Sequence, residues 1–247
     1  SPLLTVKAVG GDFHTPYVGS SPTELTEDRW IAAFQVREFR PGEKTRSSGR
    51  PKGQAGLGND YFVLHHQGVS TFPPEEQGDG GDATEIQRRA EQSVGALTYT
   101  YEVGQNAQFV PDNVGIPLKA GSSIYYNSTH LHSIGKEVKF HVQMGFKFHP
   151  KGYMPKYPNG YLGTGGGTIL SPRGGLGAEL DIPGNTDNVR FDRYQVLQRP
   201  ARVVTFEPHL HASAKRMCVE AIYPSGIIET LNCTGYNHAW VKTYTYQ

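Results

Sequence analysis

Short runs of β-branched and aromatic residues, separated by glycine and proline, recur along the whole 247-residue chain. Such residues fit a pleated, half-buried surface, and the 30 glycines and 17 prolines suit tight turns. The alternation of apolar and polar residues is clearest from Val138 to Met144. The pattern predicts an all-β fold, with strands at residues 30–39, 61–69, 96–103, 123–130, 138–148, 202–206, 216–223, 227–232 and 239–246.

Two stretches interrupt this strand pattern. Residues 41–60 are rich in Gly, Lys and Arg, which predicts a long insertion between two strands. Residues 153–184 are rich in glycine and show little periodicity, which predicts a linker or an extended loop. One short helix is predicted at 82–93.

Charge and hydropathy exclude two classes of partner. Lys and Arg number 24 against 23 Asp and Glu, so the net charge of +1 gives no basic surface for nucleic acid or for an anionic membrane. The longest apolar run, at about residues 30–34, is far shorter than the roughly 18 residues that span a bilayer. We therefore expect no transmembrane segment and no nucleic-acid partner.

The two cysteines flank a predicted β-hairpin. Its predicted turn is Pro224-Ser225-Gly226, and a turn centred between Ser225 and Gly226 places Cys218 opposite Cys233. Opposed residues of antiparallel strands have Cα atoms about 4.5 to 5.5 Å apart, which is within disulfide range. Two interpretations stay open: a disulfide bond, which favours an oxidising compartment, and two buried free thiols.

Six of the ten histidines occur in three short motifs. The motifs are His65-His66, His130-Leu131-His132 and His209-Leu210-His211. In a strand, residues i and i+2 point to the same face, so a His-x-His motif offers two imidazoles to one metal ion. Adjacent histidines point to opposite faces of a regular strand, and they share a metal only at a bulge, a strand end or a twisted edge. We interpret all six as candidate metal ligands; imidazole suits Cu, Zn, Fe and Ni alike.

The segments around these motifs follow a recognisable order. The most specific block runs through Glu207-Pro208-His209-Leu210-His211, Lys215-Arg216-Met217, Glu220-Ala221-Ile222-Tyr223-Pro224-Ser225-Gly226 and Glu229-Thr230-Leu231. Upstream, Asp28-Arg29-Trp30-Ile31 and Phe39-Arg40-Pro41-Gly42 precede His65-His66, and Ile116-Pro117-Leu118-Lys119-Ala120-Gly121-Ser122 runs into Thr129-His130-Leu131-His132. Together they resemble the bacterial copper type II, ascorbate-dependent monooxygenase family, relatives of peptidylglycine α-hydroxylating monooxygenase and dopamine β-monooxygenase. The similarity covers most of the chain outside 43–58 and 153–184.

The resemblance implies two antiparallel jelly-roll β-sandwiches in tandem, each holding one copper ion and facing a solvent-filled cleft. It implies that His65 and His66, with His130 or alternatively His132, form an electron-transfer copper site, and that the catalytic residues His209 and His211 form an oxygen-activating copper site. The implied reaction hydroxylates an aliphatic C–H bond of a small-molecule or peptide substrate, using O2 and ascorbate or another electron donor. The alternative is a non-catalytic copper-binding protein, or an extracellular interaction or structural protein, of the same fold.

The order of the motifs predicts the domain organisation. We expect an N-terminal sandwich with the His-His copper site over 1–152, a linker over 153–184, and the first part of a C-terminal sandwich with the His-x-His copper site over 185–247. The family's methionine ligand on a later strand has no match, so the second sandwich is expected to be completed by a further C-terminal part of the polypeptide or by other subunits. A secreted or periplasmic location is expected.

Overall fold

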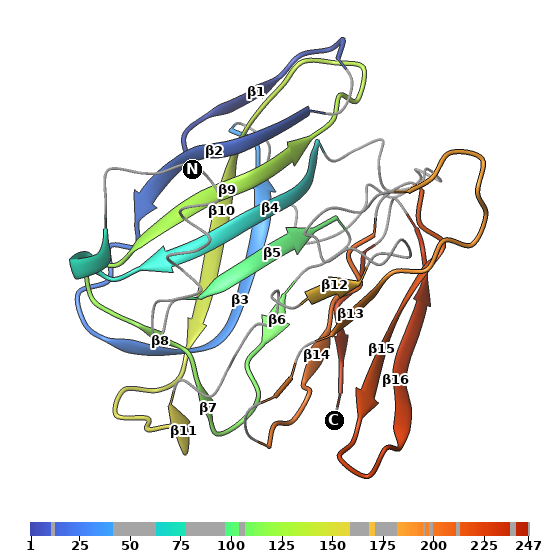
Figure 1. Cartoon of the computed structure of the whole chain (residues 1–247). Helices are drawn as coiled ribbons and strands as arrows, with labels where there is room; N and C mark the ends of the chain where they lie inside the picture. Colours follow the sequence, from blue (N-terminus) through green and yellow to red (C-terminus); the bar gives the residue numbers. More distant parts are fainter. Residues whose placement is uncertain are drawn as a thin grey trace, which may run out of the picture. The chain divides into compact units, whose positions relative to one another are not determined.

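Two antiparallel β-sheets form the N-terminal part of the computed structural model (Figure 1). One sheet has the order β1 (Leu4–Val6), β10 (Val138–Phe148), β3 (Arg29–Phe39) and β6 (Gln108–Phe109), with β8 (Pro117–Leu118) also paired to β3. The other has the order β2 (Phe13–Pro22), β9 (Ser123–Leu131), β4 (Leu64–Phe72) and β5 (Thr98–Glu102). A single turn of 3-10 helix, η2 (Pro74–Glu76), follows β4.

The remaining described strands form four separate pairs. They are β7 (Val114–Gly115) with β11 (Tyr157–Pro158), β12 (Thr168–Leu170) with β13 (Asp192–Tyr194), β14 (Thr205–Phe206) with β17 (Tyr244–Thr245), and β15 (Arg216–Ile222) with β16 (Ile228–Gly235). Only the β7–β11 pair, among these described elements, is parallel. The all-β class predicted from the sequence is confirmed, whereas the jelly-roll topology and the tandem arrangement stay predictions.

The structure describes residues 1–10, 13–41, 63–77, 97–103, 107–158, 168–170, 182–194, 196–197, 200–210, 213–237 and 241–246. The predicted insertion at 43–58 and the predicted helix at 82–93 lie outside these residues. The chain divides into two compact units, one formed by Ser1–Tyr161 with Val204–Gln247 and the other by Leu162–Val203. The predicted domain boundaries at 152 and 184 stay predictions. No helix in the described ranges has the length and apolarity to cross a membrane.

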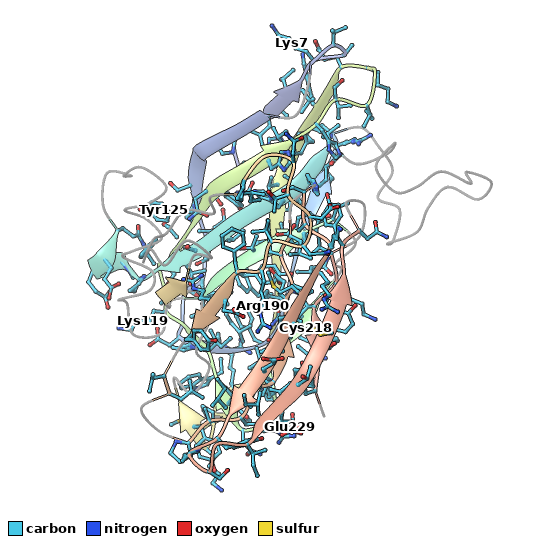
Figure 2. All side chains as sticks on the ribbon, turned by 45° about the vertical axis from the view of Figure 1, so that its right-hand side comes forward. Lys7, Lys119, Tyr125, Arg190, Cys218 and Glu229 are labelled. Carbon is cyan, nitrogen blue, oxygen red and sulfur yellow. A yellow bond between two sulfur atoms is a disulfide. The ribbon has the colours of Figure 1, made fainter. Side chains whose placement is uncertain are left out.

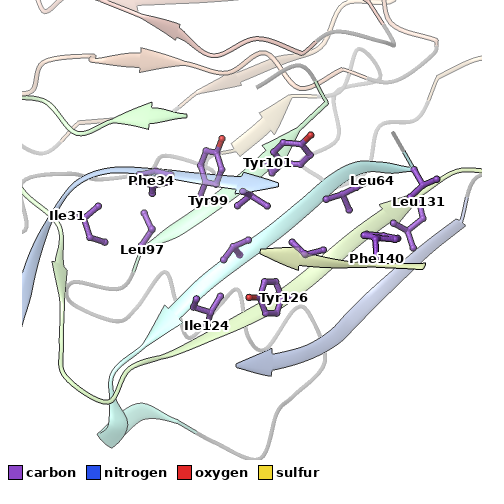
Figure 3. Packing of buried hydrophobic residues seen from close by; sticks show 14 of the residues in the cluster. Ile31, Phe34, Leu64, Leu97, Tyr99, Tyr101, Ile124, Tyr126, Leu131 and Phe140 are labelled. Atoms are coloured by element: carbon purple, nitrogen blue, oxygen red, sulfur yellow. The ribbon is translucent and has the colours of Figure 1, made fainter. Parts of the chain in front are cut away.

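The two larger sheets pack against each other through one hydrophobic core, part of which Figure 3 shows. In β10, Val138, Phe140 and Val142 are buried and alternate with more exposed residues, as the sequence pattern predicts. Across the core, the rings of Phe34 and Tyr99 meet edge to face with centroids 4.8 Å apart. Each large apolar side chain buried in this way contributes about 1.5 to 3 kcal/mol. The core therefore holds the four-stranded sheet rigidly from one side.

The strand predictions agree closely with the structure for β3, β10 and β15. β10 begins and ends where the alternation predicts, and β3 differs from its predicted range by one residue. β1 and β2 were not predicted. β2 lies at a sheet edge and contains Pro16 and Gly19, and residues of these types weaken a strand pattern although an edge tolerates them. β11 and β12 fall within the predicted linker at 153–184.

The β15–β16 hairpin carries a disulfide bond between Cys218 and Cys233, which lie opposite each other with Cα atoms 4.1 Å apart. Cys218 is labelled in Figure 2. Both cysteines are exposed, so the alternative of two buried free thiols is wrong. The N–H of Gly226 donates to the carbonyl of Tyr223, and Gly226 has a φ of 82°, which L side chains adopt only with strain.

A bulge lies between the turn of the hairpin and the two cysteines. Next to the turn, Ile222 pairs with Ile228, one residue out of the register that the sequence predicts. A register shift between Val219 and Glu220 then restores the predicted pairing of the two cysteines. The cysteine pairing was therefore predicted correctly, and the centre of the turn was not.

The hairpin geometry predicts the effect of removing the disulfide. The double variant C218S/C233S is expected to lose about 2 to 3 kcal/mol of unfolding free energy, because the bond closes a chain segment of 15 residues in the unfolded state. Chemical denaturation of the oxidised protein and of the variant measures this difference. Labelling of two thiols by a maleimide in denatured, unreduced protein would contradict the bond.

Gly68 in β4 has no room for a side chain. It pairs with Asn127 of β9, and a Cβ atom at Gly68 would overlap the side-chain oxygen and press on the backbone carbonyl of Asn127. Replacement by any other residue must therefore displace Asn127.

We expect Gly68→Ala to lower the free energy of unfolding by about 1 to 3 kcal/mol through this overpacking. Gly145→Ala is the matched control, because Gly145 is also in a strand but is exposed, and its nearest neighbour beyond the adjoining residues is the Gln35 side chain at 3.7 Å. Urea denaturation of both variants checks the prediction. Equal effects at the two positions would refute the steric explanation.

Candidate metal centre

A bulge in β4 breaks the alternation of the strand at His65. Leu64 pairs with Leu131 of β9 and His66 pairs with His130, so three residues of β4 lie against two of β9. Leu64 belongs to the sandwich core, and so does Val69 after the regular strand resumes. The extra residue therefore allows His65 and His66 to lie together on the face that points away from the core. This is the bulge that the adjacent histidines require if they are to share a site.

Five histidines gather at this bulge. The ring centroids lie 4.7 Å apart for His65 and His130, 4.9 Å for His66 and His130, 5.3 Å for His65 and His132, and 5.4 Å for His66 and His209. The rings of His65 and His130 are stacked, whereas the ring of His66 meets those of His130 and His209 edge-on. Four of the five histidines are buried, and the side chain of His209 is 36% exposed.

Glu102 completes the cluster from β5. It pairs directly with His66 across the sheet and is only 1% exposed. His209 lies in the loop between β14 and β15, and its Nδ1 is 2.5 Å from Oε1 of Glu102. One ligand atom from each of His66, Glu102 and His209 lies within 4.8 Å of the others. These three side chains form the strongest candidate metal site in the described part of the chain.

Burial and charge set the protonation of the Glu102–His209 pair in opposite ways. Burial raises the pKa of Glu102, and the hydrogen bond and charge of His209 offset part of this rise. The hydrogen bond to Glu102 raises the pKa of His209, although burial opposes it. The pKa values of both groups are therefore raised, and a metal ion bound by these side chains would compete with protons.

Glu38 of β3 fixes the start of the bulged segment from the opposite sheet. Its Oε2 accepts the backbone N–H groups of Val63 and Leu64, each at 3.1 Å. Its Oε1 pairs with Arg40 at 2.5 Å, and both side chains are buried. Burial raises the pKa of Glu38, and the guanidinium group of Arg40 offsets part of this rise. A buried ion pair thus anchors the two residues that directly precede His65.

The predicted ligands come together to a large extent. His65, His66, His130, His132 and His209 share one cluster, and His211 lies outside the described residues. The resemblance implies His209 at a second copper site, whereas the structure brings it against His66 and Glu102.

Sequence reasoning missed Glu102. Its signal was a single carboxylate in the strand Thr98–Glu102, which otherwise consists of threonine and tyrosine, at a position where burial of a charge requires a partner.

The Glu102–His209 contact predicts the titration of His209 in metal-free protein. The carboxylate stabilises the imidazolium, so Glu102→Gln is expected to lower the pKa of His209. Glu207→Gln is the control, because Glu207 raises the same pKa only by its charge and is the smallest contributor. NMR titration of the imidazole protons measures both. A drop in the Glu207 variant as large as in the Glu102 variant would refute the assignment.

Comparison with known proteins finds no relative of the chain. No family model, no curated protein and no solved structure matches the chain. The fold and the His–Glu cluster are therefore the features that bear on function.

Proposed function

We propose that this protein is a copper-dependent monooxygenase-like protein whose metal centre is the cluster around His66, Glu102 and His209. The observation that carries the proposal is the convergence of histidines from three motifs, distant in the sequence, on one bulged site of the sheet. Chance solvated histidines would not be gathered and buried in this way.

The donor set fits a transition metal ion. Imidazole nitrogen and carboxylate oxygen bind Cu, Zn and Fe, and bond lengths of about 2.0 to 2.2 Å place two ligands of one ion roughly 3 to 3.4 Å apart. The present separations, up to 4.8 Å, come within this range after small side-chain rotations. Three protein ligands leave coordination positions open, which is typical of catalytic rather than structural sites.

The side chains at this site have different roles. When bound, copper supplies electron transfer from ascorbate or another donor and the activation of O2 for hydroxylation of a C–H bond. His66 and Glu102 hold their positions from adjacent strands, and the partly exposed His209 leaves one side open to solvent and substrate. The buried His65, His130 and His132 surround the centre and limit the access of water.

The substrate and the location follow from the same proposal. The substrate is a small molecule or a peptide with an aliphatic C–H bond. The disulfide bond of the β15–β16 hairpin supports a secreted or periplasmic location, where copper and oxidised cysteines coexist.

A second candidate is a non-haem iron centre. Glu102 favours it, because two histidines and one carboxylate with open positions are the ligand set of non-haem iron oxygenases. The metal preference of the protein separates the two candidates.

Metal titration tests the centre directly. Metal-depleted protein is titrated with Cu(II), Zn(II) and, without oxygen, Fe(II), and bound metal is measured by mass spectrometry. We expect one copper ion per chain at this centre. His66→Ala, Glu102→Ala and His209→Ala are each expected to lower the copper affinity more than about a hundredfold, because removing a ligand weakens binding more than removing a residue that only hydrogen-bonds to a ligand. His141→Ala is the control, because His141 lies on β10 of the other sheet, where its ring stacks on that of Phe39.

The outcomes of this titration distinguish the functions. Copper binding with ascorbate-dependent O2 uptake supports the monooxygenase. Copper binding without O2 uptake supports a non-catalytic copper-binding protein, and preferential Fe(II) binding supports the iron centre. Metal content below about half an ion per chain, or equal losses in the His141 variant, would contradict a built metal site.

A further inference from the structure

A buried amide follows His66 in β4, and it lies on the core side of the sheet because Gln67 is two residues before the core residue Val69. Gln67 of β4 is 0% exposed, and its side-chain nitrogen donates to the backbone carbonyls of Asn127 at 2.7 Å and of Gly68 at 2.8 Å. Its side-chain oxygen accepts the hydroxyl of Thr129, also 0% exposed, at 2.9 Å. Both hydrogens of the amide nitrogen and the oxygen are therefore used within the sheet.

The register between β4 and β9 shifts twice, and these hydrogen bonds lie at the second shift. The first shift adds one residue to β4 at His65, and the second, between His66 and Gly68, adds one residue to β9. The β9 partners of Gln67 are Asn127 and Thr129, which bracket this second shift. Backbone groups leave the regular ladder at a bulge, and the amide of Gln67 supplies them with partners.

The partners of Gln67 adjoin the candidate ligands in the sequence. Gln67 follows His66, and Thr129 precedes His130, and these two histidines face each other in the register. A slip of one residue between β4 and β9 would turn His66 or His130 to the opposite face. The Gln67–Thr129 bond therefore holds together the backbone positions from which both imidazoles project.

The pairing of this buried amide indicates a role in the register of the two strands. A buried amide loses its hydration, and the hydrogen bonds that replace it return only about 0.5 to 1.5 kcal/mol each. An apolar residue of the same length would fill the space but leave the carbonyls of Gly68 and Asn127 without this partner. A buried polar network in which every donor and acceptor is paired specifies one arrangement of the strands.

We propose that Gln67 and Thr129 are positioning residues, which fix the register shift between His66 and Gly68 and thereby hold His66 and His130 on the metal-binding face. The role of these residues in metal binding rests on the function proposed above. Their role in the register of β4 and β9 does not.

The experiment compares near-isosteric variants of the network. Gln67→Met and Thr129→Val remove the hydrogen bonds at similar volume, and Thr129→Ser keeps the hydroxyl. Val69→Ala is the matched control, because Val69 is a core residue of the same strand, 1% exposed, and pairs regularly with Tyr99 and Tyr126. Copper affinity, the EPR spectrum of bound Cu(II) and the urea midpoint are measured for each variant.

We expect Gln67→Met and Thr129→Val to weaken copper binding at least about tenfold and to change the EPR spectrum. Both are also expected to lower the urea midpoint, because each leaves buried polar groups without a partner. Thr129→Ser is expected to restore the wild-type spectrum. Val69→Ala is expected to lower the midpoint and leave the spectrum unchanged. Wild-type spectra and affinities in both network variants, or an equal spectral change in Val69→Ala, would overturn the proposal.

A second measurement uses metal-free protein. Cross-strand nuclear Overhauser contacts between β4 and β9 report the register without any metal, and we expect Gln67→Met and Thr129→Val to lose the wild-type pattern around His66 and His130. An unchanged pattern would overturn the positioning role. If the wild-type protein takes up no metal but the pattern changes in the variants, the proposed function falls and the role in register stands.

Discussion

The alternation of a β-strand is the constraint on which the rest of this structure depends. Along most of β4 and β10 it sends one residue to the sandwich core and the next away from it. At His65 a single extra residue interrupts the alternation, and two adjacent imidazoles come to lie on one face. The core packs one face of the sheet, and one local departure from the regular strand brings the two imidazoles together.

Buried polar groups surround this departure on several sides. The carboxylate of Glu38 holds the backbone before it, and the carboxylate of Glu102 lies beside His66 on the outer face. Each is paired with a cation-forming side chain, Arg40 or His209, since an unpaired charge at such depth would be strongly unfavourable. Charges buried on both faces of one sheet are more readily explained by a site than by stability alone.

The sequence was sufficient for the class of fold and for most of the histidine cluster. Strands such as β10, with one buried face, leave a readable pattern, whereas the edge strand β2 does not, because its prolines and glycine follow no such pattern. The spacing of His65 and His66 indicates that a shared site needs a bulge, a strand end or a twisted edge, and the structure shows the bulge. Glu102 and the approach of His209 depend on strand pairing and on contacts between distant segments, which no local pattern encodes.

The contact between Glu102 and His209 joins segments on opposite sides of the glycine-rich stretch 153–184. Any bond at this point closes a very long loop of chain, and the entropy of the unfolded chain that such a closure removes grows with the logarithm of the loop length. A metal ion held by His66, Glu102 and His209 would therefore act as a reversible cross-link, far longer in span than the disulfide of the β15–β16 hairpin. The supply of metal in the surroundings would then control the persistence of the folded chain as well as its chemistry.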